Sequence, residues 1–145
     1  MSYNIEQVNS GYMSFTASGL AGGTTGGTFK TASTLTFTSN GIFKSKAATD
    51  NLTFTSGHTA LANSQQCLFA AWITAAGTVS TTQGPIVAAG DTAPVPAQTT
   101  AGTTLVGLIK VSCSSSQTFT PGTTTLGTGN TATYYDCSLM PGTAQ

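Results

Sequence analysis

Apolar and polar residues alternate along several short segments of this chain. The clearest case is 34–38, where Leu35 and Phe37 alternate with threonines. A period of two residues sends successive side chains to opposite faces, which is typical of a half-buried β-strand. Thr and Gly, which are abundant throughout, are poor helix formers. The pattern therefore predicts an all-β protein of about seven to nine strands, folded as an antiparallel β-sandwich or jelly-roll-like domain.

Two segments are more continuously apolar than the rest. One is Cys67–Thr74 and the other is Leu105–Cys113. In a regular strand the second segment places Leu105, Gly107, Ile109 and Val111 on one side and Val106, Leu108 and Lys110 on the other. Apolar residues on both sides indicate that both faces of this strand are buried, and a neighbouring subunit is one candidate for what packs against the second face.

Two glycine-containing loops predict β-hairpins. Around Asn40-Gly41, a two-residue turn pairs Phe37 with Lys44, whereas a three-residue loop with a bulge at Gly41 pairs Phe37 with Phe43. We favour the second register because it keeps both aromatic rings on one face. The loop at 75–77 also ends in Gly, and it pairs Ile73 with Val79 in an antiparallel meander.

The first third of the chain lacks this clear alternation. Residues 17–28 are rich in Gly and Thr, a composition typical of flexible segments. We therefore expect an extended N-terminal arm or long loop over residues 1–32 and a β-sandwich domain over residues 33–145. Within that domain, the two prolines in 89–104 predict an exposed connection, and 118–120 and 132–135 are expected to form short strands.

Charge is scarce and balanced. The 145 residues include four Lys and no Arg, four acidic residues and a formal net charge of zero. Because nucleic-acid binding depends on clustered Lys and Arg, it is not expected. The longest apolar run, 67–73, is too short to span a bilayer, so no membrane role is expected. Neutral proteins lack charge repulsion between copies, so this composition favours a regular oligomer. Residues 1–7 contain neither the basic region nor the apolar region of a Sec signal peptide, so we expect no such signal there.

The sequence offers little chemistry. His58 is the single histidine, in a Ser/Gly/Thr loop, and we interpret it as a solvated turn residue. Glu6, Asp50, Asp91 and Asp136 stand in the arm or beside turns, where turn chemistry explains them. We expect no catalytic residue, no metal site and no cofactor, and hence a protein that is not an enzyme.

Three cysteines, Cys67, Cys113 and Cys137, lack the close spacing of a zinc site. We expect them to be small buried hydrophobes, with a disulfide between two of them left open. Among the aromatic residues, Trp72 lies in an apolar run and is expected to pack in the core. Tyr134 and Tyr135 point to opposite faces of a strand, so at most one is exposed and available to stack on a sugar.

Three segments resemble tailed-bacteriophage head fibre or capsid decoration (cement) proteins. They are 40–51 (NGIFKSKAATDN), 75–85 (AAGTVSTTQGP) and 104–111 (TLVGLIKV), within a similarity that runs from about residue 34 to 137. The resemblance implies a homotrimeric β-rich knob on the outer capsid surface of a virion, with the major capsid protein as its partner. It implies no catalytic residue.

On this hypothesis the chain reinforces the shell by bridging neighbouring capsid subunits. The arm would contact the capsid through its apolar residues, the types that dominate interfaces: Tyr3, Ile5, Val8, Tyr12 and Phe15. The alternative is a tail-fibre or adhesin-like module that binds host glycans.

Overall fold

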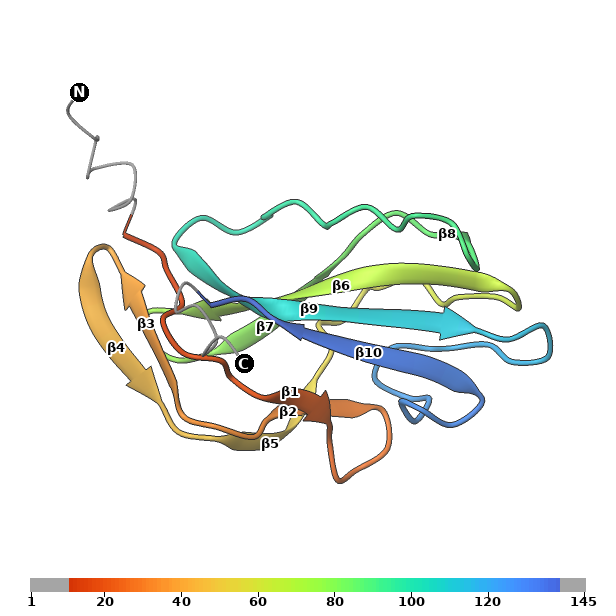
Figure 1. The fold of residues 1–145 in the computed structure, drawn as a ribbon, viewed down its shortest axis with the longest axis horizontal. Coiled ribbons are helices and arrows are strands. Elements are labelled where there is room, and N and C mark those ends of the chain that lie inside the picture. The colour runs from red at the N-terminus through yellow and green to blue at the C-terminus, as the bar shows by residue number, and fades with distance from the viewer. Residues whose placement is uncertain (1–10, 139–145) are drawn as a thin grey trace, which may run out of the picture.

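The computed structural model describes residues 11–138 and is all-β, with no helix in that range. Its strands run in the order β1 (Leu20–Gly22), β2 (Thr28–Thr31), β3 (Leu35–Ser39), β4 (Ile42–Lys46), β5 (Thr49–Thr53), β6 (Gln65–Thr74), β7 (Val79–Gln83), β8 (Val87–Ala88), β9 (Thr103–Cys113) and β10 (Asn130–Asp136). Figure 1 shows β6, β9 and β10 as the long central strands of an elongated body.

The strands form three antiparallel sheets. The largest has the order β10-β9-β6-β7, with β8 paired to the start of β6. A three-stranded sheet, β1-β2-β5, lies across from it, and the β3-β4 hairpin extends one end of the molecule (Figure 1). Buried residues of the large sheet and of the smaller sheets belong to one core cluster. The predicted antiparallel β-sandwich is therefore confirmed.

A cluster of aromatic rings fills the space between the sheets. Phe69 on β6 lies edge-on to Phe54, with ring centroids 5.0 Å apart, and to Phe119, at 6.1 Å. Phe29 on β2 contacts Phe54 in the same geometry at 5.3 Å. Edge-to-face pairs are a favoured arrangement of aromatic rings. This cluster therefore joins the two sheets through specific packing as well as through apolar burial.

Part of the predicted arm belongs to this core. Within residues 11–32, β1 and β2 pair with each other and β2 pairs with β5. Leu20 and Phe29 are 6% and 0% exposed. The Gly-rich stretch forms a tight connection, closed by a 2.9 Å bond from Gly23 N to Thr28 O. The prediction of an arm over 1–32 was wrong for 11–32, because two well-spaced apolar residues suffice to anchor short strands. Tyr3, Ile5 and Val8 lie outside the described residues.

The register of the β3-β4 hairpin also differs from the one we favoured. Phe37 pairs with Lys44 across a two-residue turn, Asn40-Gly41, whose φ angles are 51° and 74°. Asn-Gly is the preferred pair for a turn with two positive φ angles. Phe37 is 1% exposed and Phe43 68%, so the two rings lie on opposite faces. The preference of Asn-Gly for a two-residue turn therefore determined the register, and the ring of Phe43 packs against that of Phe15 instead.

The other hairpin follows its prediction. Ile73 pairs with Val79 and Trp72 with Ser80 across the 75–77 loop, where Gly77 has a φ of +83°.

β9 contains a bulge that the alternation did not reveal. Ala71 pairs with Gly107 and Trp72 with Leu105, so Val106 is an extra residue on β9. Val106 and Ile109 are both buried, whereas Leu105 lies half-buried on the outer face. The predicted grouping of Leu105 with Ile109 was wrong, because a bulge reverses the facing of every residue before it.

Candidate functional site

Two exposed surfaces stand out among the described residues. The first lies at the end of the β3-β4 hairpin, where Ile42 and Phe43 are 61% and 68% exposed. The ring of Phe15 packs on that of Phe43, with centroids 5.1 Å apart. The hydroxyl of Tyr12 donates a hydrogen bond to Asn40 Oδ1. Phe15 and Phe43 share one face of the hairpin, whereas Ile42 points to its other face and Tyr12 contacts the turn. We call these four side chains, which surround the end of the hairpin, the hairpin-end patch.

Backbone pairing brings the patch together. Residues 13–15 run along β3, where Thr38 N donates to Met13 O and Phe15 N donates to Thr36 O, both at 2.8 Å. This pairing delivers Phe15 to the face of β4 that carries Phe43. Of the five predicted capsid contacts, two are described: Phe15 lies on the face that carries Phe43, and Tyr12 contacts the turn and lines a separate hollow with Leu105 and Cys137.

The sequence analysis did not identify Ile42 and Phe43 as surface residues. The Asn-Gly turn was the signal that could have shown them to be exposed.

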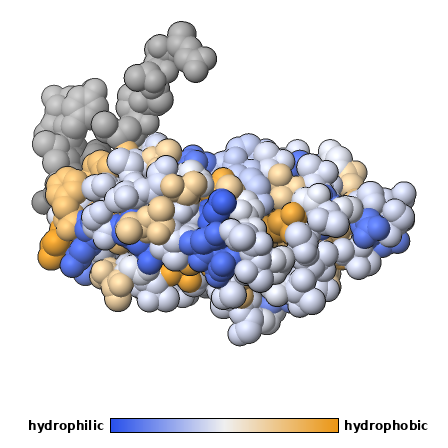
Figure 2. Space-filling model, turned by 90° about the horizontal axis from the view of Figure 1, so that it is seen from below, coloured by the Kyte–Doolittle hydropathy of each residue, from blue (hydrophilic) through white to orange (hydrophobic). Residues whose placement is uncertain are grey.

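Figure 2 shows most of one face of the molecule in pale colours, with apolar patches toward the hairpin end and smaller ones along the body.

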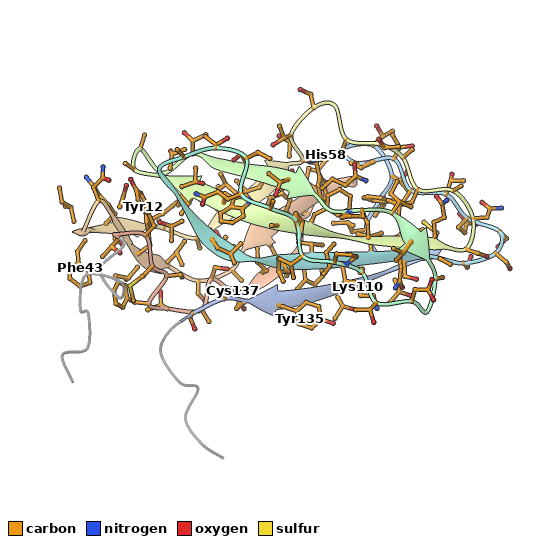
Figure 3. All side chains as sticks on the ribbon, turned by 90° about the horizontal axis from the view of Figure 1, so that it is seen from above. Tyr12, Phe43, His58, Lys110, Tyr135 and Cys137 are labelled. Carbon is orange, nitrogen blue, oxygen red and sulfur yellow. The ribbon has the colours of Figure 1, made fainter. Side chains whose placement is uncertain are left out.

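The second surface is a cleft on the outer face of the large sheet, with a volume of about 490 Å³. Leu68 and Leu108 form part of its floor, and Tyr135, 47% exposed, stands at one side. The loop that follows β8 lines it with Asp91 and other residues, and Lys110 also borders it. We call this the Tyr135 cleft. Figure 3 shows Lys110 and Tyr135 close together and far from Tyr12 and Phe43.

A buried glutamine holds the loop that borders this cleft. Gln66 is 1% exposed; its Nε2 donates to Asp91 O, and its Oε1 accepts from Gly90 N at 3.3 Å. Asp91 N also donates to Ala88 O at 3.1 Å. Buried polar groups with all their partners rigidify a structure, so the loop has a defined position over the sheet.

His58 is not the solvated turn residue we expected. Its Nε2 lies 2.8 Å from Thr81 Oγ1, and its ring packs against Phe69 with centroids 5.4 Å apart. Desolvation lowers the pKa of His58 below its ordinary value. The side chain is therefore neutral at pH 7 and serves packing.

Two of the acidic residues that the structure describes, Asp136 and Asp50, accept hydrogen bonds that connect distant segments of the chain. Asp136 Oδ1 accepts from Ser18 N at 2.9 Å, from Ser18 Oγ at 2.6 Å and from Leu20 N at 3.3 Å. Asp50 accepts hydrogen bonds from the side chain and the backbone of Thr24, which lower the pKa of its carboxyl. Asp91 lines the Tyr135 cleft, and Glu6 lies outside the described residues.

The three cysteines are free thiols, and Cys67 and Cys113 are buried. Burial raises the pKa of Cys67 to about 11 and also raises the pKa of Cys113 and of Cys137. Over residues 11–138, no group of three or more His, Cys, Asp or Glu side chains comes together to hold a metal ion. The same part of the chain contains no helix long and apolar enough to cross a membrane.

The aromatic residues of the large sheet divide between its two faces. Tyr134 packs against the core while Tyr135 is exposed, which confirms that one of the two at most is accessible. Trp72 was expected in the core, but it is half-buried outside the core cluster, and its Nε1 donates to Thr82 Oγ1 at 2.8 Å. It pairs with Leu105 across the bulge, on the outer face.

No protein-family model, no curated protein and no solved structure matches this chain.

Proposed function

We propose that this chain is a structural virion protein that decorates the exterior of a bacteriophage capsid as a homo-oligomeric knob and stabilises the shell. The hairpin-end patch is the observation that carries the proposal, because it is a surface suited to docking. The resemblance of three segments to phage head fibre and decoration proteins supplies the partner, the major capsid protein, and the expected homotrimer.

The patch has the composition and placement of a protein interface. When a partner covers a large exposed apolar side chain, its burial stabilises the complex by about 1.5–3 kcal/mol for each fully buried side chain. Aromatic residues in a cluster are the usual anchors of such contacts. Phe15 and Phe43 are already packed on each other, so little conformational entropy is lost when the pair docks.

The rest of the surface suits crowding on a particle. Its charge is low and balanced, and many of the exposed residues are Thr, Ser and Gly. Neutral surfaces lack long-range repulsion between copies, so many knobs can stand side by side. A protein that binds only the assembled shell stabilises it by mass action.

A binding assay with capsids that lack this protein tests the docking surface. Wild-type protein should cosediment with the particles, and Phe43→Ser should weaken binding by about 30-fold, as expected for one anchor ring. Val95→Ser is the matched control, because Val95 is an exposed apolar residue, 60%, outside the patch. Equal binding by Phe43→Ser and wild type would refute docking through the patch.

A second variant separates the patch from the N-terminal segment. Removal of residues 1–10 deletes Tyr3, Ile5 and Val8 but leaves the described strands intact. Loss of capsid binding in this truncation, with Phe43→Ser unaffected, would assign docking to the segment instead. Native mass spectrometry of the purified protein checks the expected trimer.

The alternative function is a tail-fibre or adhesin-like module that binds host glycans. The exposed ring of Tyr135 in a cleft favours it. Abundance in the particle separates the two: a decoration protein is present in numbers comparable to the major capsid protein, and a tail-tip protein is scarce.

A further inference from the structure

We propose that the Tyr135 cleft is a binding site for a neutral hexopyranose unit of a glycan. The cleft lies away from the hairpin-end patch, so a sugar could bind while the patch is docked (Figure 3). It deepens the alternative function named above by giving the site and the class of ligand, and it does not require the structural role.

The sheet presents Tyr135 as a platform. Tyr135 pairs with Leu108 of β9, and Leu108 pairs with Ala70 of β6, so these side chains form one row across the outer face. Leu68 and Lys110 pair in the next row. Leu108 and Leu68, which line the cleft beside Tyr135, make its floor apolar.

An aromatic ring beside an apolar floor fits one face of a pyranose. The C–H bonds of the sugar ring carry partial positive charge, which is attracted to the negative face of an aromatic ring. Tyr135 keeps nearly half of its surface exposed although its strand is paired along its length. The ring is therefore available for stacking, and its position is fixed by the strand.

The polar groups of the cleft fit the hydroxyl rim of the same sugar. Asp91 offers carboxylate oxygens that accept hydrogen bonds, Lys110 offers an ammonium that donates them, and Thr92 has a hydroxyl that does both. A sugar hydroxyl is itself both donor and acceptor. The opposite charges of Asp91 and Lys110 favour a neutral ligand, since an anion would meet the carboxylate and a cation the ammonium.

The site is preorganised. Gln66, buried beneath the loop, bonds both to Gly90 N and to Asp91 O, so the loop keeps its place over the sheet without a ligand. Gly90 has a φ of +100°, a conformation that favours glycine. Binding therefore needs little ordering of the loop, which is a main cost of recognition.

The size of the cleft agrees with this class of ligand. A volume of about 490 Å³ lies within the usual range of small-molecule sites, roughly 300–1,000 Å³. Such sites combine apolar and aromatic walls with a few placed polar groups. The cleft has this composition.

Titration of the ¹⁵N-labelled full chain by NMR tests the proposal. The probes are the methyl pyranosides of glucose, mannose, galactose and N-acetylglucosamine, each added to about 20 mM, because single sugars are expected to bind with a Kd of about 1 mM. At least one should produce saturable shifts at the amides of Leu68, Asp91, Leu108 and Tyr135. Absence of saturable shifts with all four overturns the proposal, and so does saturation confined to another surface.

Three variants assign the binding to the cleft. Tyr135→Ala should weaken binding about tenfold, Tyr135→Phe should retain it because the ring remains, and Lys110→Met should weaken it by a smaller factor. A dispersed spectrum verifies that each variant is folded. Equal affinity in Tyr135→Ala and wild type overturns the stacking role of the ring.

Phe43→Ser is the matched control, an exposed aromatic at the hairpin end. It should bind the sugar like wild type while it loses capsid docking, and Tyr135→Ala should show the reverse. Failure of one activity is thus distinguishable from failure of the other.

Discussion

Replacement of Asp136 should weaken the attachment of the segment 18–20 to the large sheet. Asp136 ends β10, and one of its carboxylate oxygens accepts three hydrogen bonds from Ser18 and Leu20. Ser18 is 0% exposed, and Leu20 belongs to the core. The carboxylate therefore joins segments that are 118 positions apart in the sequence.

The magnitude follows from the donors left without a partner. In Asp136→Ala, Ser18 loses the acceptor of both its buried N–H and its hydroxyl, and each unsatisfied buried group costs about 1–3 kcal/mol. Because Asp136 is itself exposed and water can enter, the lower part of the range applies. We expect a loss of about 2–4 kcal/mol in the free energy of unfolding, or about 6–12 °C in Tm for a domain of this size.

Urea denaturation followed by tryptophan fluorescence measures the loss, and hydrogen exchange locates it at the Ser18 and Leu20 amides. Asp136→Asn is the matched control, since its amide oxygen can still accept the same bonds and should cost about 1 kcal/mol. The reasoning is refuted if Asp136→Ala stays within about 0.5 kcal/mol of wild type, the range of ordinary surface changes. It is also refuted if the Asn variant loses as much as the Ala variant.

Three further predictions concern the core, the turn and the thiols. Phe69→Ala, which removes the ring at the centre of the aromatic cluster, should cost about 3–5 kcal/mol by chemical denaturation, whereas Phe43→Ala should change stability by less than about 0.5 kcal/mol. Gly41→Ala should lower the free energy of unfolding by about 1 kcal/mol because residue 41 has a positive φ; no atom lies within 4 Å of an added Cβ, so no steric clash contributes. Gly41→Asn should recover part of this loss. An Ala variant as stable as wild type would contradict the turn geometry. The pKa of the Cys67 thiol is raised to about 11 from 9.0, so the folded state retains a proton that the unfolded state releases. Stability should therefore be full below pH 9 and fall as the pH rises to 11, by up to about 3 kcal/mol, and a Cys67→Ala variant with the same pH dependence would assign the effect to other groups.

The sequence by itself determined the class of fold and the positions of β3, β4, β6, β7, β9 and β10. It missed the short strands β1, β2, β5 and β8, and the strand expected at 118–120 was wrong, because Phe119 forms only an isolated bridge to Leu61. Period-two alternation is a local property, and Leu35 and Phe37 report a buried face whatever lies opposite. The 75–77 loop set its own register, because a three-residue loop ending in Gly has few geometries. The split of Tyr134 and Tyr135 between two faces follows from the same pleat.

Other features were decided only by contacts between distant segments. The placement of β1 depends on Asp136, and the outward facing of Leu105 depends on a bulge opposite Trp72. At the β3-β4 hairpin, the Asn-Gly turn outweighed the pairing of two aromatic rings, because Phe43 had a partner in Phe15.

The two candidate surfaces show the same division. Tyr12 and Phe15 were recognised from residue type alone, but Ile42 and Phe43 joined them only through the observed register. The Tyr135 cleft requires a loop from residues 90–93 to be held over β6 by Gln66, and no periodicity encodes that contact. Alternation along a strand specifies which side chains share a face. What covers that face depends on long-range packing, and this decides whether an outward residue is buried, exposed or part of a site.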